Sequence, residues 1–244
     1  MSDDFRPPSP RTNPFASRHT RPGAIPFRFG PNDPDSDERF QNILTGLRQH
    51  RLGLIVGNHG SGKSTLLHGI AESLQTQFPG GKWIQLTGEP ERSPLRGFSC
   101  VLANDRAVGE VQSAVSPGGV LVVDGAEQLS PWGRYQLRRR AQRAGHACLV
   151  TAHRDLRGFH VLHRTKVTAK LIEGLLHELL RDHPDAREKL MPTGGRLLET
   201  LPEITDVREL WSQLYDVVGL PLETSESGCS GNRLESHPKN YPDH

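Results

Sequence analysis

The chain has 244 residues, of which 34% are hydrophobic, with a mean hydropathy of -0.56 and a formal net charge of +2. This length suits one domain of ordinary size plus tails, and the low hydrophobic content indicates that part of the chain lies outside a packed core. The charge is too mild to indicate a nucleic-acid-binding protein by itself.

The cysteines and the apolar runs indicate the compartment. Cys100, Cys148 and Cys229 are widely spaced and odd in number, which suggests neither a disulfide framework nor a zinc site. No apolar run approaches the roughly 20 residues that span a bilayer, and residues 1–14 are polar and proline-rich without an apolar signal core. We therefore expect a cytoplasmic protein with reduced thiols and no membrane span.

The N-terminal segment, residues 1–36, is rich in Pro, Arg and Asp and lacks periodicity, which predicts mostly irregular structure. Two apolar groups interrupt it, Asn13-Pro14-Phe15 and the run from Ala24 to Phe29. Two interpretations stay open. The segment could lie extended on the surface of the folded domain, or it could be a disordered tail with chance aromatics.

Strands and helices are expected to alternate from residue 37 onward. An acidic first turn and apolar spacing predict a helix from Ser36 or Asp37. Short apolar runs predict strands, and segments with helical spacing predict helices. The expected strands are 52–56, 83–86, 120–124, 147–151 and a short fifth within 160–167; the expected helices are 64–77, 101–115, 132–144 and 169–181, with a Pro-rich loop over 89–97.

This order predicts an α/β fold with a doubly wound, mainly parallel sheet of five strands. Val120-Leu121-Val122-Val123 is continuously apolar, as a parallel strand buried on both faces must be. We expect an α/β core over 37–168 and a helical C-terminal subdomain, or lid, over 169–221. Its last segments are helical near Leu197 and over 206–218, and residues 222–244 form a disordered tail.

A phosphate-binding loop lies between the first strand and the helix after it. The loop fits G-x-x-x-x-G-K-[ST] in full and comprises Gly57, Asn58, His59, Gly60, Ser61, Gly62, Lys63, Ser64 and Thr65. The glycines let the backbone turn its N–H groups inward, and the helix adds the positive end of its dipole. Lys63 would reach the β- and γ-phosphates and Ser64 would ligate Mg²⁺. The alternative is a glycine-rich turn before a helix.

Carboxylates after the third strand predict the second half of the site. Asp124 ends that strand, where ligands bind in open α/β sheets, and so occupies the Walker B position of a second metal ligand. Gly125 stands where many P-loop ATPases carry a water-orienting glutamate, and Glu127 could substitute for it. The alternatives are a strand-terminal Asp that starts a turn and a solvated Glu at a helix start.

Two further side chains follow the next strand. Thr151 ends it, and its hydroxyl could hydrogen-bond the attacking water or the γ-phosphate. His153 could do the same, or could be an ordinary surface histidine.

With these residues assembled, the chain resembles the P-loop ATPases of the AAA+ and STAND grouping over about residues 36–220. The resemblance is carried by NHGSGKST, VLVVDGAEQL, CLVTAH and the helical tail. It implies ATP and Mg²⁺ as cofactors, and a sensor 2 arginine, Arg208, that folds over the γ-phosphate. Asn13-Pro14-Phe15 is similar to an N-terminal motif of secretion and transposition ATPases, where it could help to enclose adenine.

Several functions remain open at this stage. The first is an ATPase whose hydrolysis drives a conformational switch, with a protein partner, a homo-oligomer or a nucleic acid as its target. A P-loop kinase acting on a small molecule is the alternative enzyme, and the lack of an LSGGQ-like signature argues against an ABC ATPase. A nucleic-acid-binding module is the fourth interpretation, and it rests on five arginines of one helix near two aromatics: Arg134, Arg138, Arg139, Arg140, Arg143, Trp132 and Tyr135. The same arginines could equally form a solvated helix face, or meet an acidic neighbour in an oligomer and supply an arginine finger to it, and these interpretations come before nucleic acid.

Overall fold

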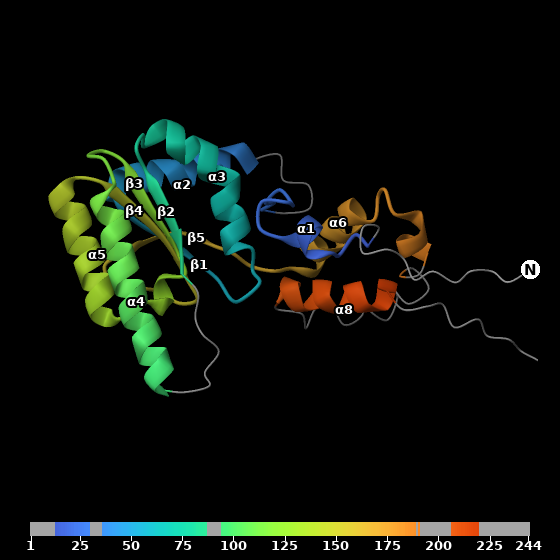
Figure 1. Cartoon of the computed structure of the whole chain (residues 1–244). Coiled ribbons are helices and arrows are strands. Elements are labelled where there is room, and N and C mark those ends of the chain that lie inside the picture. Colours follow the sequence, from blue (N-terminus) through green and yellow to red (C-terminus); the bar gives the residue numbers. More distant parts are fainter. Residues whose placement is uncertain (1–12, 30–35, 87–93, 189, 191–205, 220–244) are drawn as a thin grey trace, which may run out of the picture.

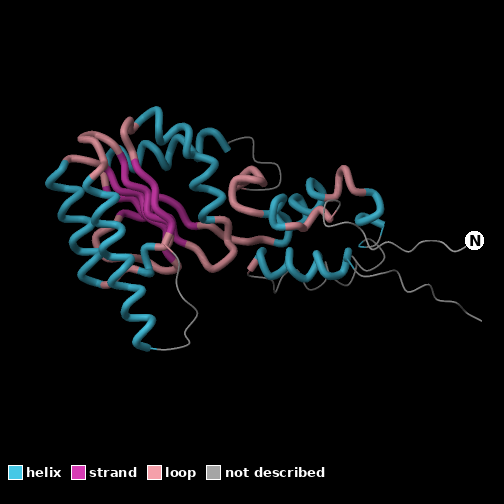
Figure 2. The backbone as a smooth tube through the Cα atoms, in the orientation of Figure 1, coloured by secondary structure: helices cyan, strands magenta, loops and turns pink. Residues whose placement is uncertain are grey.

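A five-stranded sheet forms the centre of the molecule (Figures 1 and 2). The computed structural model describes residues 13–29, 36–86, 94–188, 190 and 206–219. The strand order is β2-β3-β4-β1-β5, and every neighbouring pair is parallel. The strands are β1 (Leu52–Val56), β2 (Lys82–Gln85), β3 (Val120–Asp124), β4 (Ala147–Ala152) and β5 (His160–Arg164).

Helices cover both faces of the sheet. On one face, α2 (Ser36–His50) and α3 (Lys63–Gln77) pack over side chains such as Ile55 and Leu149. On the other, α4 (Pro94–Ser113) and α5 (Pro131–Ala144) pack over Leu54 and Val150 (Figure 1). Consecutive strand residues point to opposite faces, so both faces need apolar side chains. The predicted doubly wound α/β fold is confirmed, with all five strands parallel.

A third cluster lies beyond the sheet and joins both ends of the described chain. It includes α6 (Ala169–Leu179), α8 (Val207–Gly219) and the N-terminal arm, residues 13–29, with its short helix α1 (Ser17–Thr20). Phe15 stacks on Trp211 with 5.6 Å between ring centroids, and Asn13 Nδ2 donates to the carbonyl of Tyr215 at 3.0 Å. The arm therefore lies packed on the surface, as one of the two interpretations expected.

The second apolar group of the arm is anchored on the core. Phe27 and Phe29 meet edge to face at 5.0 Å, and Phe29 contacts Phe40 of α2 at 5.0 Å and His163 of β5 at 5.1 Å. Aromatic pairs in this geometry stabilise beyond their buried area. The arm thus runs from α8 to α2 and fastens the C-terminal helices to the sheet domain. The division of the chain into domains stays a prediction.

Two boundaries differ from expectation. The chain turns helical at Pro94 in α4, within the segment expected to be a loop up to Gly97. Proline suits the first turn of a helix, because its φ is already helical and its missing N–H has no partner to lose there. α6 ends at Leu179, and a helical turn follows over 184–188. The irregular stretch 1–12, the helix near Leu197 and the tail 222–244 lie outside the described residues.

Within the described part of the chain, no helix combines the length and the apolar character that a bilayer crossing requires.

The fold predicts where truncation is costly. Leu149 is fully buried in the central strand β4, so Leu149→Ala should lower the free energy of unfolding by about 3 kcal/mol through lost burial and a residual cavity. Chemical denaturation measures this. The control is Leu102→Ala on α4, whose side chain is 51% exposed, with an expected change within about 0.5 kcal/mol. Equal losses for the two variants would contradict the packing described.

Candidate functional site

The phosphate-binding loop connects β1 to α3 and turns through two left-handed glycines. Gly60 has φ 63° and Gly62 has φ 88°, conformations that side chains rarely adopt. A Cβ on Gly60 would collide with Asp206 at the start of α8, so this glycine also permits close approach of the C-terminal helices. Behind the loop, Ser61 Oγ and Thr165 Oγ1 share a buried hydrogen bond of 2.6 Å.

Lys63 is held inside the loop at the first turn of α3. Its Nζ donates to the carbonyls of Gly57 and Asn58, both at 2.7 Å, and lies 3.3 Å from His153 Nδ1. Burial lowers the pKa of Lys63, and the carboxylates of Glu127 and Asp124 oppose the shift. The ammonium is therefore shielded from water and close to two carboxylates.

Asp124 and Thr151 are joined across two neighbouring strands. Thr151 Oγ1 donates to Asp124 Oδ1 at 2.6 Å and accepts from the N–H of Gly125 at 2.8 Å. Both side chains are buried, and both lie at the end of their strand. The hydroxyl proton of Thr151 thus goes to Asp124 and holds that carboxylate in one orientation.

Gly125 brings Glu127 back toward the site. Its φ of 94° is left-handed, and a Cβ there would lie 3.1 Å from the carbonyl oxygen of Leu86. The 3₁₀ turn η1 (Ala126–Gln128) follows directly. It places Glu127 Oε1 2.8 Å from His153 Nε2, while Oε2 is buried without a hydrogen-bond partner among the described residues. One carboxylate oxygen is therefore held by His153, and the other is buried without a donor among the described residues.

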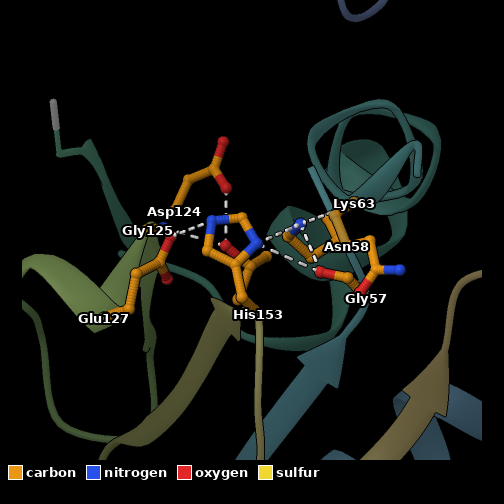
Figure 3. A network of polar contacts seen from close by, with 8 residues as sticks. Gly57, Asn58, Lys63, Asp124, Gly125, Glu127 and His153 are labelled. Carbon is orange, nitrogen blue, oxygen red and sulfur yellow. Dashed lines mark hydrogen bonds and ion pairs between the residues drawn. The ribbon is translucent and has the colours of Figure 1, made fainter. Parts of the chain in front are cut away.

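His153 lies between Glu127 and Lys63, as Figure 3 shows. Burial lowers its pKa, and Lys63 and His59 add to the shift, while Glu127 and the carbonyl of Gly57 oppose it. The neutral ring is then the ordinary form at pH 7. Nδ1 lies 3.3 Å from Lys63 Nζ, which donates, and 3.2 Å from the carbonyl oxygen of Gly57, which accepts, so these contacts alone do not decide its protonation. Nε2 faces only the carboxylate of Glu127, so in the neutral ring a proton on Nε2 suits both Glu127 and Lys63. His59 stacks on this ring with 3.7 Å between centroids.

A cavity of about 660 Å³ collects these groups. Its walls include loop residues 59–65, the residues after β3 and β4, the arm over 25–28, and α6 and α8. Arg208 of α8 lines it, and Asp206 Oδ1 accepts the N–H of Arg208 at 2.8 Å. Gly57 and Asn58 line an adjoining cavity of about 360 Å³ behind the loop, together with His153.

The donor set fits Mg²⁺. Ser64 and Asp124 line the same cavity and offer a hydroxyl and a carboxylate, the hard oxygen donors that this ion prefers. No group of three or more His, Cys, Asp or Glu side chains suited to a metal occurs in the described part of the chain. In many Mg²⁺ sites one or two side chains act together with substrate phosphates and water.

The structure therefore brings the predicted site residues together. His59 to Thr65, Asp124, Glu127, Thr151, His153 and Arg208 all line the larger cavity. Gly125 makes the turn after Asp124 that one of the alternatives for this aspartate expects. Ile25, Pro26 and Phe27 contribute to the cavity wall, as expected of an apolar run that lies on the domain surface. Sequence reasoning missed Leu171, Leu175 and Trp211, which line the same cavity, because their position depends on contacts distant in sequence.

Comparisons with known proteins find similarity in solved structures alone. No protein-family model and no curated protein matches the chain. AMPPCP-bound DnaA from Aquifex aeolicus is 12% identical, with a TM-score of 0.45, and the match covers 86% of this chain and 65% of that one. PCH-2 of C. elegans is 13% identical with a TM-score of 0.39, covering 75% and 66%, and the S. cerevisiae Hsp104-ADP complex is 15% identical with a TM-score of 0.43, covering 83% and 31%.

These neighbours are AAA+ ATPases, and at such identities the likeness concerns the fold alone. The chain spans less than two thirds of the length of the DnaA structures that it matches. Its parallel sheet and its phosphate-binding loop between β1 and α3 decide the fold. The fold is a parallel α/β sheet with a glycine-rich loop between β1 and α3, as predicted from the sequence. The resemblance to the AAA+ and STAND grouping stays a prediction.

The charge arrangement around His153 predicts the effect of Glu127→Gln on its titration. Glu127 raises the pKa of His153 against the opposing effect of burial, so removing the carboxylate should lower that pKa further. Histidine NMR chemical shifts followed against pH measure it. Glu110→Gln, on the exposed surface of α4, is the control and should leave the titration unchanged. An unchanged or higher pKa of His153 in Glu127→Gln would contradict the pairing.

Proposed function

We propose that the chain binds ATP with Mg²⁺ and hydrolyses it, and that hydrolysis drives a conformational switch. One observation carries the proposal. The predicted phosphate-binding loop, Asp124 and Glu127 line one cavity of about 660 Å³. That volume is within the usual range of small-molecule sites.

Binding rests on the loop and the first turn of α3. Backbone N–H groups and the helix dipole would receive the β- and γ-phosphates. Lys63, which is bonded to the carbonyls of Gly57 and Asn58, would exchange them for phosphate oxygens. Ser64 and Asp124 would hold Mg²⁺, which would supply charge neutralisation at the phosphates.

Glu127 is proposed to activate the attacking water. Its Oε1 is held by the Nε2–H of His153, which leaves Oε2 to accept a proton from water. The water oxygen then bonds to the γ-phosphorus, the bond from the γ-phosphorus to the bridging oxygen breaks, and ADP and phosphate leave. The departure from Asp-Glu is compensated here by Gly125, whose left-handed turn returns the carboxylate to the cavity.

Thr151 is proposed as a positioning residue rather than a donor to water. Its single hydroxyl proton is already donated to Asp124. If the Thr151 hydroxyl were lost or rotated, the carboxylate of Asp124, which would ligate Mg²⁺, would no longer be held in one orientation. In this arrangement Thr151 links the end of β4 to the phosphate site.

The switch is proposed to lie between the loop and α8. Arg208 would contact the γ-phosphate, and Asp206 lies against Gly60 of the loop. Loss of the γ-phosphate would change both contacts, and the ring stack of Phe15 on Trp211 would carry the shift of α8 to the arm. The apolar wall formed by Ile25, Pro26 and Trp211 is proposed to face the adenine.

Lys63→Ala tests the site. The variant should bind Mg·ATP about 100-fold more weakly, because a charge-assisted contact to phosphate is lost. Isothermal titration calorimetry measures the affinity. Lys82→Ala, an exposed lysine on β2, is the matched control and should bind as the unmodified protein does. Undiminished binding in Lys63→Ala would remove the assignment of the loop.

Glu127→Gln separates binding from turnover. It should leave the affinity for Mg·ATP within a few-fold of the unmodified protein and lower kcat about 100-fold, since an amide cannot accept the proton of water. Phosphate release under saturating Mg·ATP gives kcat. Glu110→Gln should retain full turnover. If Glu127→Gln retained it as well, Glu127 would have no role as a base.

A further inference from the structure

The outer surface of α5 carries exposed aromatic rings. Trp132 is 65% exposed and Tyr135 is 37% exposed, and the two rings stack with 5.3 Å between centroids and 29° between planes. Large side chains exposed in contact with one another mark interaction surfaces more often than single exposed ones do. Both rings are exposed to water and belong to neither of the apolar clusters that cover the sheet.

Arginines continue the same ridge. Arg139 and Arg143 are exposed and follow Tyr135 by four and eight residues, so all three lie on one face of the helix. Arg139 Nη1 donates to Tyr135 Oη at 2.7 Å, and its guanidinium lies 6.0 Å from the ring centroid. We call Trp132, Tyr135, Arg139 and Arg143 the α5 ridge.

The positive charge of this region is not neutralised. Among the residues that the structure describes, no ion pair joins an arginine of α5 to a carboxylate. The pKa of Arg134 is lowered, mainly by burial and next by the nearby positive charge of Arg154. The carboxylates of Asp105 and Glu127 oppose this shift. Exposed Arg154 and Arg157 thus extend the positive field onto the loop after β4.

The α5 ridge lies on a helix that is capped at both ends, and it lies apart from the cavity of about 660 Å³. Ser130 Oγ caps α5 by accepting from the N–H of Gly133 at 2.8 Å, and Gly145 ends the helix at φ 70°. No residue of α5 lines the cavity. In Figure 1 the helix lies on the far side of the sheet domain from α6 and α8.

We propose that the α5 ridge binds single-stranded nucleic acid. A base stacks on the exposed ring of Trp132, which Tyr135 supports from its other side, and backbone phosphates lie against Arg139 and Arg143. A single strand is favoured over a duplex because only unstacked bases offer their faces to protein rings. An acidic protein would use the arginines and leave the stacked, exposed ring pair without a role. Neither contact reads base edges or the sugar, so binding is independent of sequence.

The test is fluorescence anisotropy of a labelled oligo-dT of about 20 nucleotides, longer than the stretch that one small binding domain covers. Trp132→Ala should weaken binding about tenfold through lost stacking, and Trp132→Phe should restore most of it. Arg139→Gln combined with Arg143→Gln should flatten the slope of log affinity against log salt by about 1.4, since each single-strand phosphate contact contributes about 0.7.

Matched controls separate the ridge from general effects. Leu102→Ala removes an exposed aliphatic side chain of α4 and Arg48→Gln removes an exposed charge of α2, and neither should change binding. Lys63→Ala should retain oligonucleotide binding, because the ridge does not depend on the proposed ATP site. A Trp132→Ala variant with unchanged affinity would overturn the proposal. So would a poly-glutamate peptide that competes as well as unlabelled oligo-dT, which would indicate an acidic protein partner.

Discussion

The hydrogen bond from Thr151 to Asp124 follows from the constraint that shapes the whole chain. The sheet is covered on both faces, and its buried strands β1, β3 and β4 carry polar side chains only near their carboxyl ends. β3 and β4 are parallel neighbours, and their carboxyl ends therefore meet. A buried carboxylate at that edge needs a donor, and the hydroxyl one strand away supplies it at 2.6 Å. One hydrogen bond thus both satisfies the buried carboxylate and fixes its orientation.

The same edge explains the position of Glu127. Directly after Asp124 the chain must turn away from the sheet beside the carbonyl of Leu86, and Gly125 makes that turn at φ 94°. A side chain at this position would strain the backbone and crowd the carbonyl. The carboxylate of Glu127 therefore comes two residues after Gly125, from the turn η1, and meets His153, which directly follows β4. The departure from the common Asp-Glu pattern is a local solution to backbone geometry.

Local patterns made the loop, the five strands and most helices predictable from sequence. Strand, loop and helix from Leu52 to Gln77 are adjacent in the chain, so their signals stand in one window. The arm was not predictable in this way. The hydrogen bond between Asn13 and Tyr215 joins residues 202 positions apart, and the bond between Ser61 and Thr165 joins residues 104 positions apart. No local residue pattern specifies such pairs. Pro94 shows a second limit of prediction from local patterns. Proline occurs both in loops and in the first turn of a helix, so the sequence predicts a loop where α4 in fact begins.

The arm gives the two ends of the chain a common mechanical connection. Phe15 stacks on Trp211 of α8, while Phe29, 14 residues later, packs on the core. Asp206, five residues before Trp211, lies against Gly60 of the phosphate loop. A displacement of that loop would therefore either shift α8 or separate Gly60 from Asp206. A shift of α8 would in turn either move the arm or separate the rings of Phe15 and Trp211. Because packed rings shift between discrete arrangements rather than deform, this connection favours a two-state response to the phosphates.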